Sequence, residues 1–369
     1  LLIRFPKKWQ HLAPGKPGST TDRLVSFVDY APTVLNLLGQ PIPKAMQGEP
    51  FLGPDAAAPR RYVYGHRDRV DEVRDLARSV RGRRYLYIRN YMPHLGYNQP
   101  TAWPDNGEIR HEFYRLAKRE KMTDAQWHYA GPTRPIEELY DCQTDPQNLK
   151  NLAGSKAHQK ILKRLRNAHR KHIRDTVDLG FLPESEAWEM FDQKTGWELG
   201  QSGQMKMGAI QRAAAQVGTA DEATLAQNLT SKNASIRYWA ALGLVHRNAL
   251  KIETKQLLRK ALTDESPAVR IEVANTLAHH GDSARAAQAL IKDLAHENLI
   301  IVTHAARTIE LLGETALNAK VPMAAALKRA ETIRPPNTPA TVVLPGDKDL
   351  AMFVAFSCRA FLSKFDTSD

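Results

Sequence analysis

Residues 268–277 read Ala-Val-Arg-Ile-Glu-Val-Ala-Asn-Thr-Leu, and this pattern recurs upstream and downstream at a nearly constant spacing. Its equivalents are residues 235–244, Ser-Ile-Arg-Tyr-Trp-Ala-Ala-Leu-Gly-Leu, and residues 300–309, Ile-Ile-Val-Thr-His-Ala-Ala-Arg-Thr-Ile. Apolar Ile236, Val269 and Ile301 stand at the same place in each copy and are spaced 33 and 32 residues apart. A fixed period of this length predicts a stack of helical repeats, each burying its apolar face against its neighbour.

Each copy follows a second apolar segment with helical spacing, so that every repeat is expected to be a helix pair. These preceding helices are expected at residues 223–229, 254–262 and 286–294. The Pro-x-Val-Arg start at Pro267–Arg270 resembles short HEAT-like repeats. The third copy has Val302 in place of the Arg and is interpreted as a terminal or degenerate unit. We expect an all-α solenoid over residues 208–330, preceded by a basic helix and linker over 155–207 and followed by a tail over 331–369 with a candidate capping helix at 347–364.

The first 154 residues have a mixed pattern that predicts a small sheet with helices. A helix is expected to begin near Pro32, with Asp29 or Tyr30 near its cap, and to end at Gly39. Strands are expected at residues 61–64, 84–89 and 138–141, and a short helix at 112–121. Leu1–Pro6 reads as a buried strand already under way, which suggests a fragment whose N-terminal part is missing.

Composition limits the classes of protein to which this chain belongs. Of its 369 residues, 42% are hydrophobic and 25% are charged, which excludes a disordered chain or a fibre. No run of about 18 apolar residues exists, so no helix is expected to span a membrane. The net charge of +12 favours an anionic partner. Two cysteines far apart, Cys142 and Cys358, exclude a zinc ribbon and a disulfide scaffold.

The most arginine-rich stretch is residues 60–90, with ten arginines against four acidic residues. Here His66, Arg67 and Arg69 follow a predicted strand and precede what reads as an acidic helix start. This places them on a loop at a strand end, where α/β sheets bind ligands, and arginine pairs with sulfate or carboxylate through two hydrogen bonds. The alternative is a salt-bridge network with Asp68 and Asp71 that holds the loop.

Several short motifs in residues 1–153 resemble the sulfatase family when taken together and in order. They are residues 2–6 (Leu-Ile-Arg-Phe-Pro), 25–35 (Val-Ser-Phe-Val-Asp-Tyr-Ala-Pro-Thr-Val-Leu), 38–43 (Leu-Gly-Gln-Pro-Ile-Pro), 85–91 (Tyr-Leu-Tyr-Ile-Arg-Asn-Tyr) and 138–141 (Glu-Leu-Tyr-Asp). Residues 64–69 and the Arg-Asn-Tyr strand look similar to heparan N-sulfatase-like and arylsulfatase-like members. The resemblance implies the C-terminal subdomain of an α/β fold of the alkaline phosphatase superfamily, here followed by HEAT-like repeats.

The resemblance implies an enzyme that hydrolyses sulfate esters or sulfamates, with a sulfated carbohydrate as the expected substrate. The family's nucleophile is a formylglycine made from a Cys-x-Pro-Ser-Arg motif, and neither Cys142 nor Cys358 is followed by that pattern. The calcium ligands are expected in the missing N-terminal part, so this chain is expected to contain no catalytic or metal-binding residue and to be inactive alone. His66, Arg67 and Arg69 remain the candidate substrate-binding residues. The family also implies a periplasmic or extracellular location.

A second function class stays open: a HEAT-like scaffold that binds a protein partner, with an inactive sulfatase remnant. Tyr97, Trp103 and Trp127 could line a sugar-binding face or pack under a long loop. The basic helix within residues 155–178 could contact nucleic acid, although a solvated face with Lys and Arg stems over apolar surface is the favoured interpretation.

Overall fold

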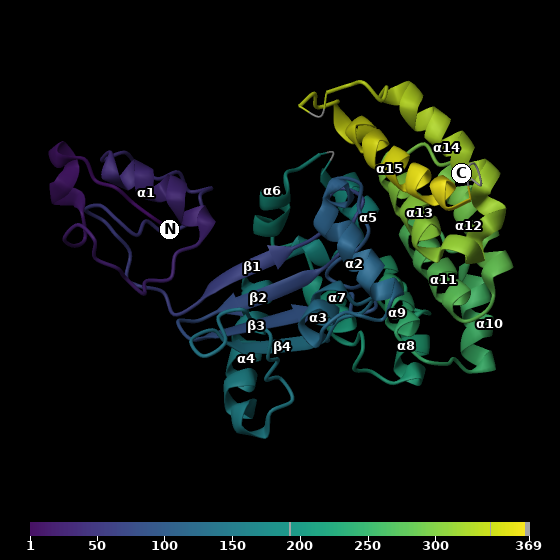
Figure 1. The fold of residues 1–369 in the computed structure, drawn as a ribbon, viewed down its shortest axis with the longest axis horizontal. Coiled ribbons are helices and arrows are strands. Elements are labelled where there is room, and N and C mark those ends of the chain that lie inside the picture. Colours follow the sequence, from purple (N-terminus) through teal and green to yellow (C-terminus); the bar gives the residue numbers. More distant parts are fainter. Residues whose placement is uncertain (192, 340, 366–369) are drawn as a thin grey trace. The chain divides into compact units, whose positions relative to one another are not determined.

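The computed structural model describes residues 1–191, 193–339 and 341–365 (Figure 1). The chain divides into two compact units. The first unit contains Leu1–His66, Arg78–Arg89 and Glu137–His172. The second contains Arg67–Ala77, Asn90–Ile136 and the chain from Ile173 onward. Each unit is therefore assembled from separate stretches of sequence.

The first unit is built on a four-stranded sheet of order β1-β2-β3-β4. The strands are β1 (Val63–Arg67), β2 (Ala77–Arg81), β3 (Tyr85–Asn90) and β4 (Glu137–Asp141). β3 and β4 are antiparallel, with Tyr85 opposite Asp141 and Arg89 opposite Glu137. The basic helix α4 (Gln159–Asp175) follows the 3-10 helix η4 (Lys156–His158).

Helix α4 and the sheet bury a small apolar core between them. The core contains Val80 of β2, Tyr87 of β3 and Leu139 of β4, packed with Leu162 and Leu165 of α4. The other residues of α4 are mostly charged, which gives the amphipathic pattern of a helix that covers one sheet face.

The N-terminal part of this unit contains the helix that the sequence predicts. The elements of this part are η1 (Lys7–Leu12), η2 (Phe27–Asp29) and the predicted helix, α1 (Tyr30–Leu37). Gly39, with a φ of 66°, follows α1. The buried Asp29 carboxylate accepts hydrogen bonds from the backbone N–H groups of Ser26 and Glu49, at 2.7 and 2.9 Å. The expectation of a buried strand over residues 1–6 is wrong: they form no regular structure, and Leu1 and Leu2 are exposed. A strand needs a neighbouring strand for its backbone hydrogen bonds, and the sheet formed by the described residues, β1-β2-β3-β4, does not include residues 1–6.

The second unit is mainly helical. Its elements before the repeats are η3 (Pro104–Asn106), α2 (Glu108–Lys118), α3 (Asp124–Ala130), η5 (Leu179–Phe181), α5 (Glu184–Phe191), α6 (Gly196–Gln201) and α7 (Met207–Ala215). The repeats follow as α8 (Glu222–Asn228) with α9 (Ala234–Val245), α10 (Ile252–Ala261) with α11 (Pro267–His279), and α12 (Ser283–Leu294) with α13 (Leu299–Leu312). The last elements are η6 (Gly313–Ala319), α14 (Lys320–Ile333), η7 (Gly346–Leu350), α15 (Ala351–Leu362) and η8 (Ser363–Phe365).

Polar residues fix where the repeat helices begin. The side chains of Asp221, Asn233 and Asn298 each accept a hydrogen bond from a backbone N–H in the first turn of α8, α9 and α13. α11 begins with Pro267 in its first turn, where a missing N–H costs nothing. The second helices of the repeats pack in series, α11 against both α9 and α13. The predicted period of helix pairs is confirmed, and the fold class of a small sheet with helices followed by HEAT-like repeats is the one observed.

The core of the second unit extends beyond the repeats. Leu76, Tyr91 and Met92 are buried in the same cluster as the apolar residues of α9, α11 and α13. The indole of Trp239 donates a 2.8 Å hydrogen bond to the backbone oxygen of Phe181. Residues 67–77 and 90–136 therefore fold together with the repeats rather than as a separate layer.

The expected elements between the strands need corrections. The helix expected at 112–121 is α2, Glu108–Lys118, and it is followed by α3, which the sequence pattern did not reveal. No helix follows Arg69: an isolated bridge between Val70 and Val73 closes a tight turn instead, and β2 comes next. Asp71, which lies where the acidic start of a helix was expected, has a φ of 52°. A right-handed helix does not allow this backbone angle, so the residue lies in a turn.

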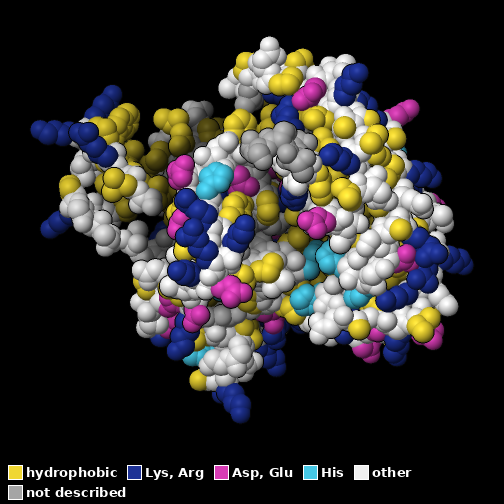
Figure 2. All heavy atoms as spheres, turned by 45° about the vertical axis from the view of Figure 1, so that its right-hand side comes forward, with side chains coloured by type: hydrophobic (Ala, Val, Ile, Leu, Met, Phe, Trp, Pro, Cys, Tyr) yellow, Lys and Arg dark blue, Asp and Glu magenta, His cyan; other side chains and the backbone are white. Residues whose placement is uncertain are grey.

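Within the described ranges, no helix has the length and apolar character required to cross a lipid bilayer. In the face shown in Figure 2, Lys and Arg side chains are more prominent than Asp and Glu, as the net charge of +12 implies. Helices α5 and α6 lie within the stretch expected as a linker, and α15 lies within the expected capping helix at 347–364.

Candidate functional site

The chain reverses direction at Val70–Val73, within the arginine-rich segment that follows β1. The backbone N–H groups of Val70 and Val73 each donate a 2.9 Å hydrogen bond to the other residue's carbonyl oxygen. Because the chain reverses here, the residues before the turn lie beside those that follow it. Arg67 and Arg69 precede the turn, and Arg74 and Asp75 follow it.

Asp75 is the buried centre of the first cluster, with 4% of its surface exposed. The Arg67 Nε lies 2.8 Å from its Oδ2, and the Arg134 Nη1 donates to the same oxygen at 2.8 Å. The Arg134 Nη2 pairs with the other oxygen. Burying a carboxylate is costly unless it is paired, and here two guanidinium groups pair with Asp75.

Arg69 pairs with Glu184, the first residue of α5. Its Nε lies 2.9 and 2.7 Å from the two carboxylate oxygens of Glu184, and its Nη1 donates to the backbone oxygen of Asp71 at 2.5 Å. The guanidinium carbon is 5.6 Å from the ring centre of Phe353. Arg69 therefore has defined partners within the protein and only 19% of its side chain is exposed.

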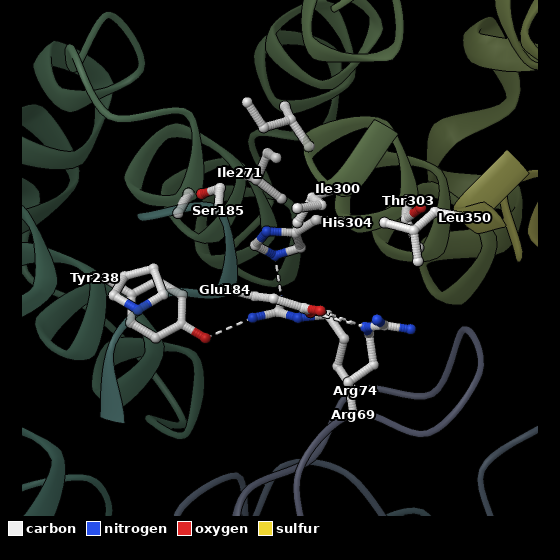
Figure 3. Close-up of a pocket in the computed structure, with 13 residues that line it drawn as sticks. Arg69, Arg74, Glu184, Ser185, Tyr238, Ile271, Ile300, Thr303, His304 and Leu350 are labelled. Atoms are coloured by element: carbon white, nitrogen blue, oxygen red, sulfur yellow. Dashed lines mark hydrogen bonds and ion pairs between the residues drawn. The ribbon is translucent and has the colours of Figure 1, made fainter. Parts of the chain in front are cut away.

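Arg74 enters the helical repeats, as Figure 3 shows. Its Nη1 donates a 2.5 Å hydrogen bond to the Glu272 carboxylate, and its Nη2 donates one of the same length to the Tyr238 hydroxyl. His304 is the third partner: its Nε2 contacts the Arg74 Nη1 and lies 3.0 Å from the Glu272 Oε1. One residue of the segment thus contacts α9, α11 and α13 at once.

The surroundings of this cluster lower the pKa values of both Glu272 and His304. Burial raises the pKa of Glu272, but the charge of Arg74 and the hydrogen bonds from His304 and Arg74 outweigh it and lower the pKa overall. Burial and the Arg74 charge lower the pKa of His304. The carboxylate is therefore held charged and the imidazole neutral, so that Arg74 and Glu272 form the ion pair.

The cavity beside this cluster is small. Arg69, Arg74, Glu184, Tyr238 and His304 are among its lining residues, and its volume is about 20 Å³. This is space for roughly one water molecule. A sugar ring does not fit, so the cavity itself is not a substrate pocket.

The three predicted substrate-binding residues have different neighbours in the structure. Arg67 is bound to Asp75 and Arg69 to Glu184, neither of them one of the acidic residues considered from the sequence. His66 belongs to the other unit, where its ring lies 5.4 Å from the ring of His172. Arg67 keeps 43% of its side chain exposed and is the more accessible of the two arginines.

The strand-end argument for these residues concerns the carboxyl edge of a parallel sheet, and β3 and β4 of this sheet pair antiparallel. The aromatic candidates are divided as well: Tyr97 lies 5.5 Å from the Arg134 guanidinium, Trp103 packs edge-on against Phe356, and Trp127 is half exposed.

Sequence reasoning missed Arg74 and its partners, although a signal was present. Trp239, Glu272 and His304 occupy the same position of successive repeats, between residues that are otherwise apolar or small. Equivalent positions of stacked repeats lie side by side, so a Glu and a His at this position indicate a buried polar contact. Only the structure identifies Arg74 as the third member.

Comparisons with known proteins give matches to a repeat family and to sulfatases. The HEAT repeat family model matches residues 222–310. Two ulvan-active sulfatases of Formosa agariphila are similar, one 37% identical over 187 residues, which is 50% of this chain and 30% of that protein. The other is 31% identical over 172 residues, 45% of this chain and 31% of that protein. The chain combines a sulfatase-like region with HEAT-like repeats.

The chain spans about 30% of the length of the curated relatives it matches. Among solved structures, a Bacteroides thetaiotaomicron protein assigned as a sulfatase has 24% identity and a TM-score of 0.26, covering 41% of this chain and 25% of its own. A protein solved with its substrate D-glucosamine-2-N,6-O-disulfate has 18% identity and a TM-score of 0.25, covering 40% of this chain and 23% of its own.

The residues present do not fit the formylglycine or the calcium ion that sulfatases use. Burial raises the pKa of the Cys358 thiol to about 12, and the Cys142 Sγ lies 3.3 Å from the Asn148 Oδ1. In the described parts of the chain, no three His, Cys, Asp or Glu side chains gather as metal ligands do. Asp75 and Glu272 are each paired with arginine instead.

Proposed function

We propose that this chain is part of a sulfatase that hydrolyses sulfate esters or sulfamates on a sulfated carbohydrate. Residues 1–369 supply the smaller subdomain, part of the substrate cleft and the helical repeats. The formylglycine and the calcium ligands come from segments outside these residues. The observation that carries the proposal is the 37% identity over half of the chain to an ulvan-active sulfatase.

Within this proposal, Arg67 is the substrate contact among the predicted residues. Its exposed side chain is anchored by the buried Asp75, which fixes the direction of the guanidinium. A planar guanidinium held in one orientation loses little entropy when it pairs with sulfate. Arg69 positions the segment through Glu184, and His66 is retained as a candidate contact.

A second candidate function is a binding scaffold that uses the HEAT-like repeats and carries an inactive sulfatase remnant. The observation that favours it is the use of Arg69 and Arg74 in ion pairs with Glu184 and Glu272, which leaves fewer arginines for substrate. A protein partner would then bind through the repeats.

The two candidates differ in sulfate release. We expect the full natural gene product to release sulfate from sulfated polysaccharides, measured by ion chromatography, and residues 1–369 alone to release none. Sulfate release by residues 1–369 that a point change within them abolishes contradicts the division of roles. A full gene product that binds but never cleaves sulfated polysaccharides supports the scaffold. A periplasmic or extracellular location, tested by cell fractionation, belongs to the same proposal.

A further inference from the structure

A second and larger cavity lies in the sheet-containing unit. Its volume is about 430 Å³, within the range of small-molecule sites. We call it the arginine groove, and its lining residues are Pro59, Arg60, Arg61, Tyr62, Gly82, Arg83, Arg84, Tyr85, Arg164 and Leu165. They come from the segment before β1, the β2–β3 turn and helix α4. Five of the ten are arginines, and no described Asp or Glu is among them.

Two of these arginines have no partner for their charge among the residues the structure describes. Neither Arg61 nor Arg164 forms an ion pair or a side-chain hydrogen bond there, and both are exposed. The Arg61 guanidinium lies 5.3 Å from the centre of the Tyr62 ring. Like charges gathered around one groove repel each other, and an anion in the groove removes that repulsion.

Two further arginines are held in place from behind. Arg84 donates from Nε and Nη2 to the Asp141 carboxylate at 3.0 and 2.6 Å, and this hydrogen bonding lowers the pKa of Asp141 to about 2. Arg60 donates from Nη2 to Asp29 and Glu49 at 2.8 and 3.0 Å. None of these hydrogen bonds uses the Nη1 of Arg84 or Arg60. The groove therefore has guanidinium groups that are oriented before a ligand binds.

Aromatic rings complete the lining. Tyr62 and Tyr85 contribute flat apolar surface beside the guanidinium groups, and the Arg84 guanidinium lies 5.1 Å from the Tyr85 ring centre. A sugar ring has an apolar face that packs on such surface, while its sulfate groups pair with arginine forks. The groove thus offers both kinds of contact that a sulfated sugar uses.

We propose that the arginine groove is a binding site for a sulfated polysaccharide chain. None of residues 66–69 lines it, so it is a site additional to the candidate residues above. The choice of sulfated carbohydrate over nucleic acid rests on the proposed function; the five arginines of the groove lining favour a polyanion of either kind. It anchors the polymer rather than reacting with it.

The test compares binding of dextran sulfate and unsulfated dextran to residues 1–369 by isothermal titration calorimetry at fixed ionic strength. The groove variant is Arg61→Gln with Arg164→Gln. The matched control is Lys160→Gln with Lys163→Gln, which removes two charges from exposed residues of the same helix α4 outside the groove lining. Circular dichroism serves to check that all variants fold.

We expect dextran sulfate to bind and dextran not to, the groove variant to lose at least tenfold in affinity, and the control to lose less than threefold. Arg61→Lys with Arg164→Lys keeps the charge and should still lose severalfold, because lysine cannot pair through two hydrogen bonds. Equal losses in the groove variant and the control overturn the proposal in favour of a diffuse basic surface. Tighter binding of single-stranded DNA than of dextran sulfate overturns it in favour of nucleic acid.

Sulfate release by the full gene product separates this site from the proposed function. If the groove variant binds dextran sulfate normally and the gene product releases sulfate, the groove proposal is wrong and the proposed function stands. Loss of binding in the groove variant, together with a gene product that never releases sulfate, supports the groove and contradicts the enzymatic function. If inorganic sulfate displaces dextran sulfate when the two are at matching concentrations, the groove is not a site for an extended polysaccharide chain.

Discussion

Arg74 donates a 2.5 Å hydrogen bond to Glu272, and 198 residues of sequence separate the two. Glu272 is 2% exposed and belongs to α11, in the middle of the helical repeats. Arg74 directly follows the Val70–Val73 turn, between β1 and β2. This pair therefore ties the arginine-rich segment to the repeats and makes them one folding unit.

Removing Arg74 should destabilise that unit strongly. Arg74→Met leaves the Glu272 carboxylate buried without its cation, which costs roughly 3–5 kcal/mol of unfolding free energy. Urea denaturation measures the loss, and Arg119→Met at the exposed end of α2 is the control, with little expected change. Arg74→Met combined with Glu272→Met should recover much of the loss, because no charge then remains buried. Equal stability of Arg74→Met and the control would contradict a structural role for the pair.

Acid should destabilise the second unit through His94. Burial lowers the pKa of this histidine from 6.5 to about 4; Glu272 opposes the shift, and the charges of His279, Arg74 and His246 reinforce it. The folded pKa lies below the unfolded value, so the stability contribution is complete above pH 6.5 and is lost as the pH falls toward 4. Its size is on the order of 3 kcal/mol.

Thermal melting of His94→Gln across this pH range checks the assignment. The variant should show a shallower decline than the wild type, with a remaining slope from His246, His280 and His304, whose pKa values burial also lowers. His111→Gln, at an exposed position of α2, is the control and should follow the wild type. Parallel curves for His94→Gln and the wild type would show that His94 is not the group that titrates.

Arg67→Lys and Arg69→Lys should have different effects in the full gene product. Arg69 loses its two contacts with Glu184, so its variant should lower the melting temperature and change KM little. Arg67 is exposed toward solvent, so its variant should raise KM with kcat nearly unchanged, a loss of roughly 1.5–3 kcal/mol in binding. A KM that stays constant in Arg67→Lys, with a lowered melting temperature, ends the recognition role for Arg67.

Ala274 tests the packing of the repeats. It is fully buried in α11, which packs against α9, α12 and α13. Ala274→Leu should overpack this junction and cost roughly 1–3 kcal/mol in urea denaturation. Ala325→Leu, at an exposed position of α14, is the matched control and should be close to neutral. If both variants unfold at the same urea concentration, the helices do not approach closely at Ala274.

Local sequence patterns were sufficient for much of the fold. The spacing of Ile236, Val269 and Ile301 fixes the repeat period, since each helix pair must bury the same face. Gly39 marks the end of α1, because a positive φ suits glycine. Strand β2 was missed because Ala77–Arg81 contains two charged arginines, one of them buried, which hide its alternation.

The sequence by itself determined the helix pairs, the strands rich in tyrosine and the surplus of arginine. These depend on the periodicity and chemistry of neighbouring residues, which the chain displays locally. Only the tertiary structure decided which arginines are used internally and which remain available. Arg69 and Arg74 meet carboxylates 115 and 198 residues away, whereas Arg61 and Arg164 line a groove without a recorded acidic partner among the described residues. Those distances in sequence are the physical reason: an ion pair forms between groups that folding brings within about 4 Å, and no local pattern records that approach.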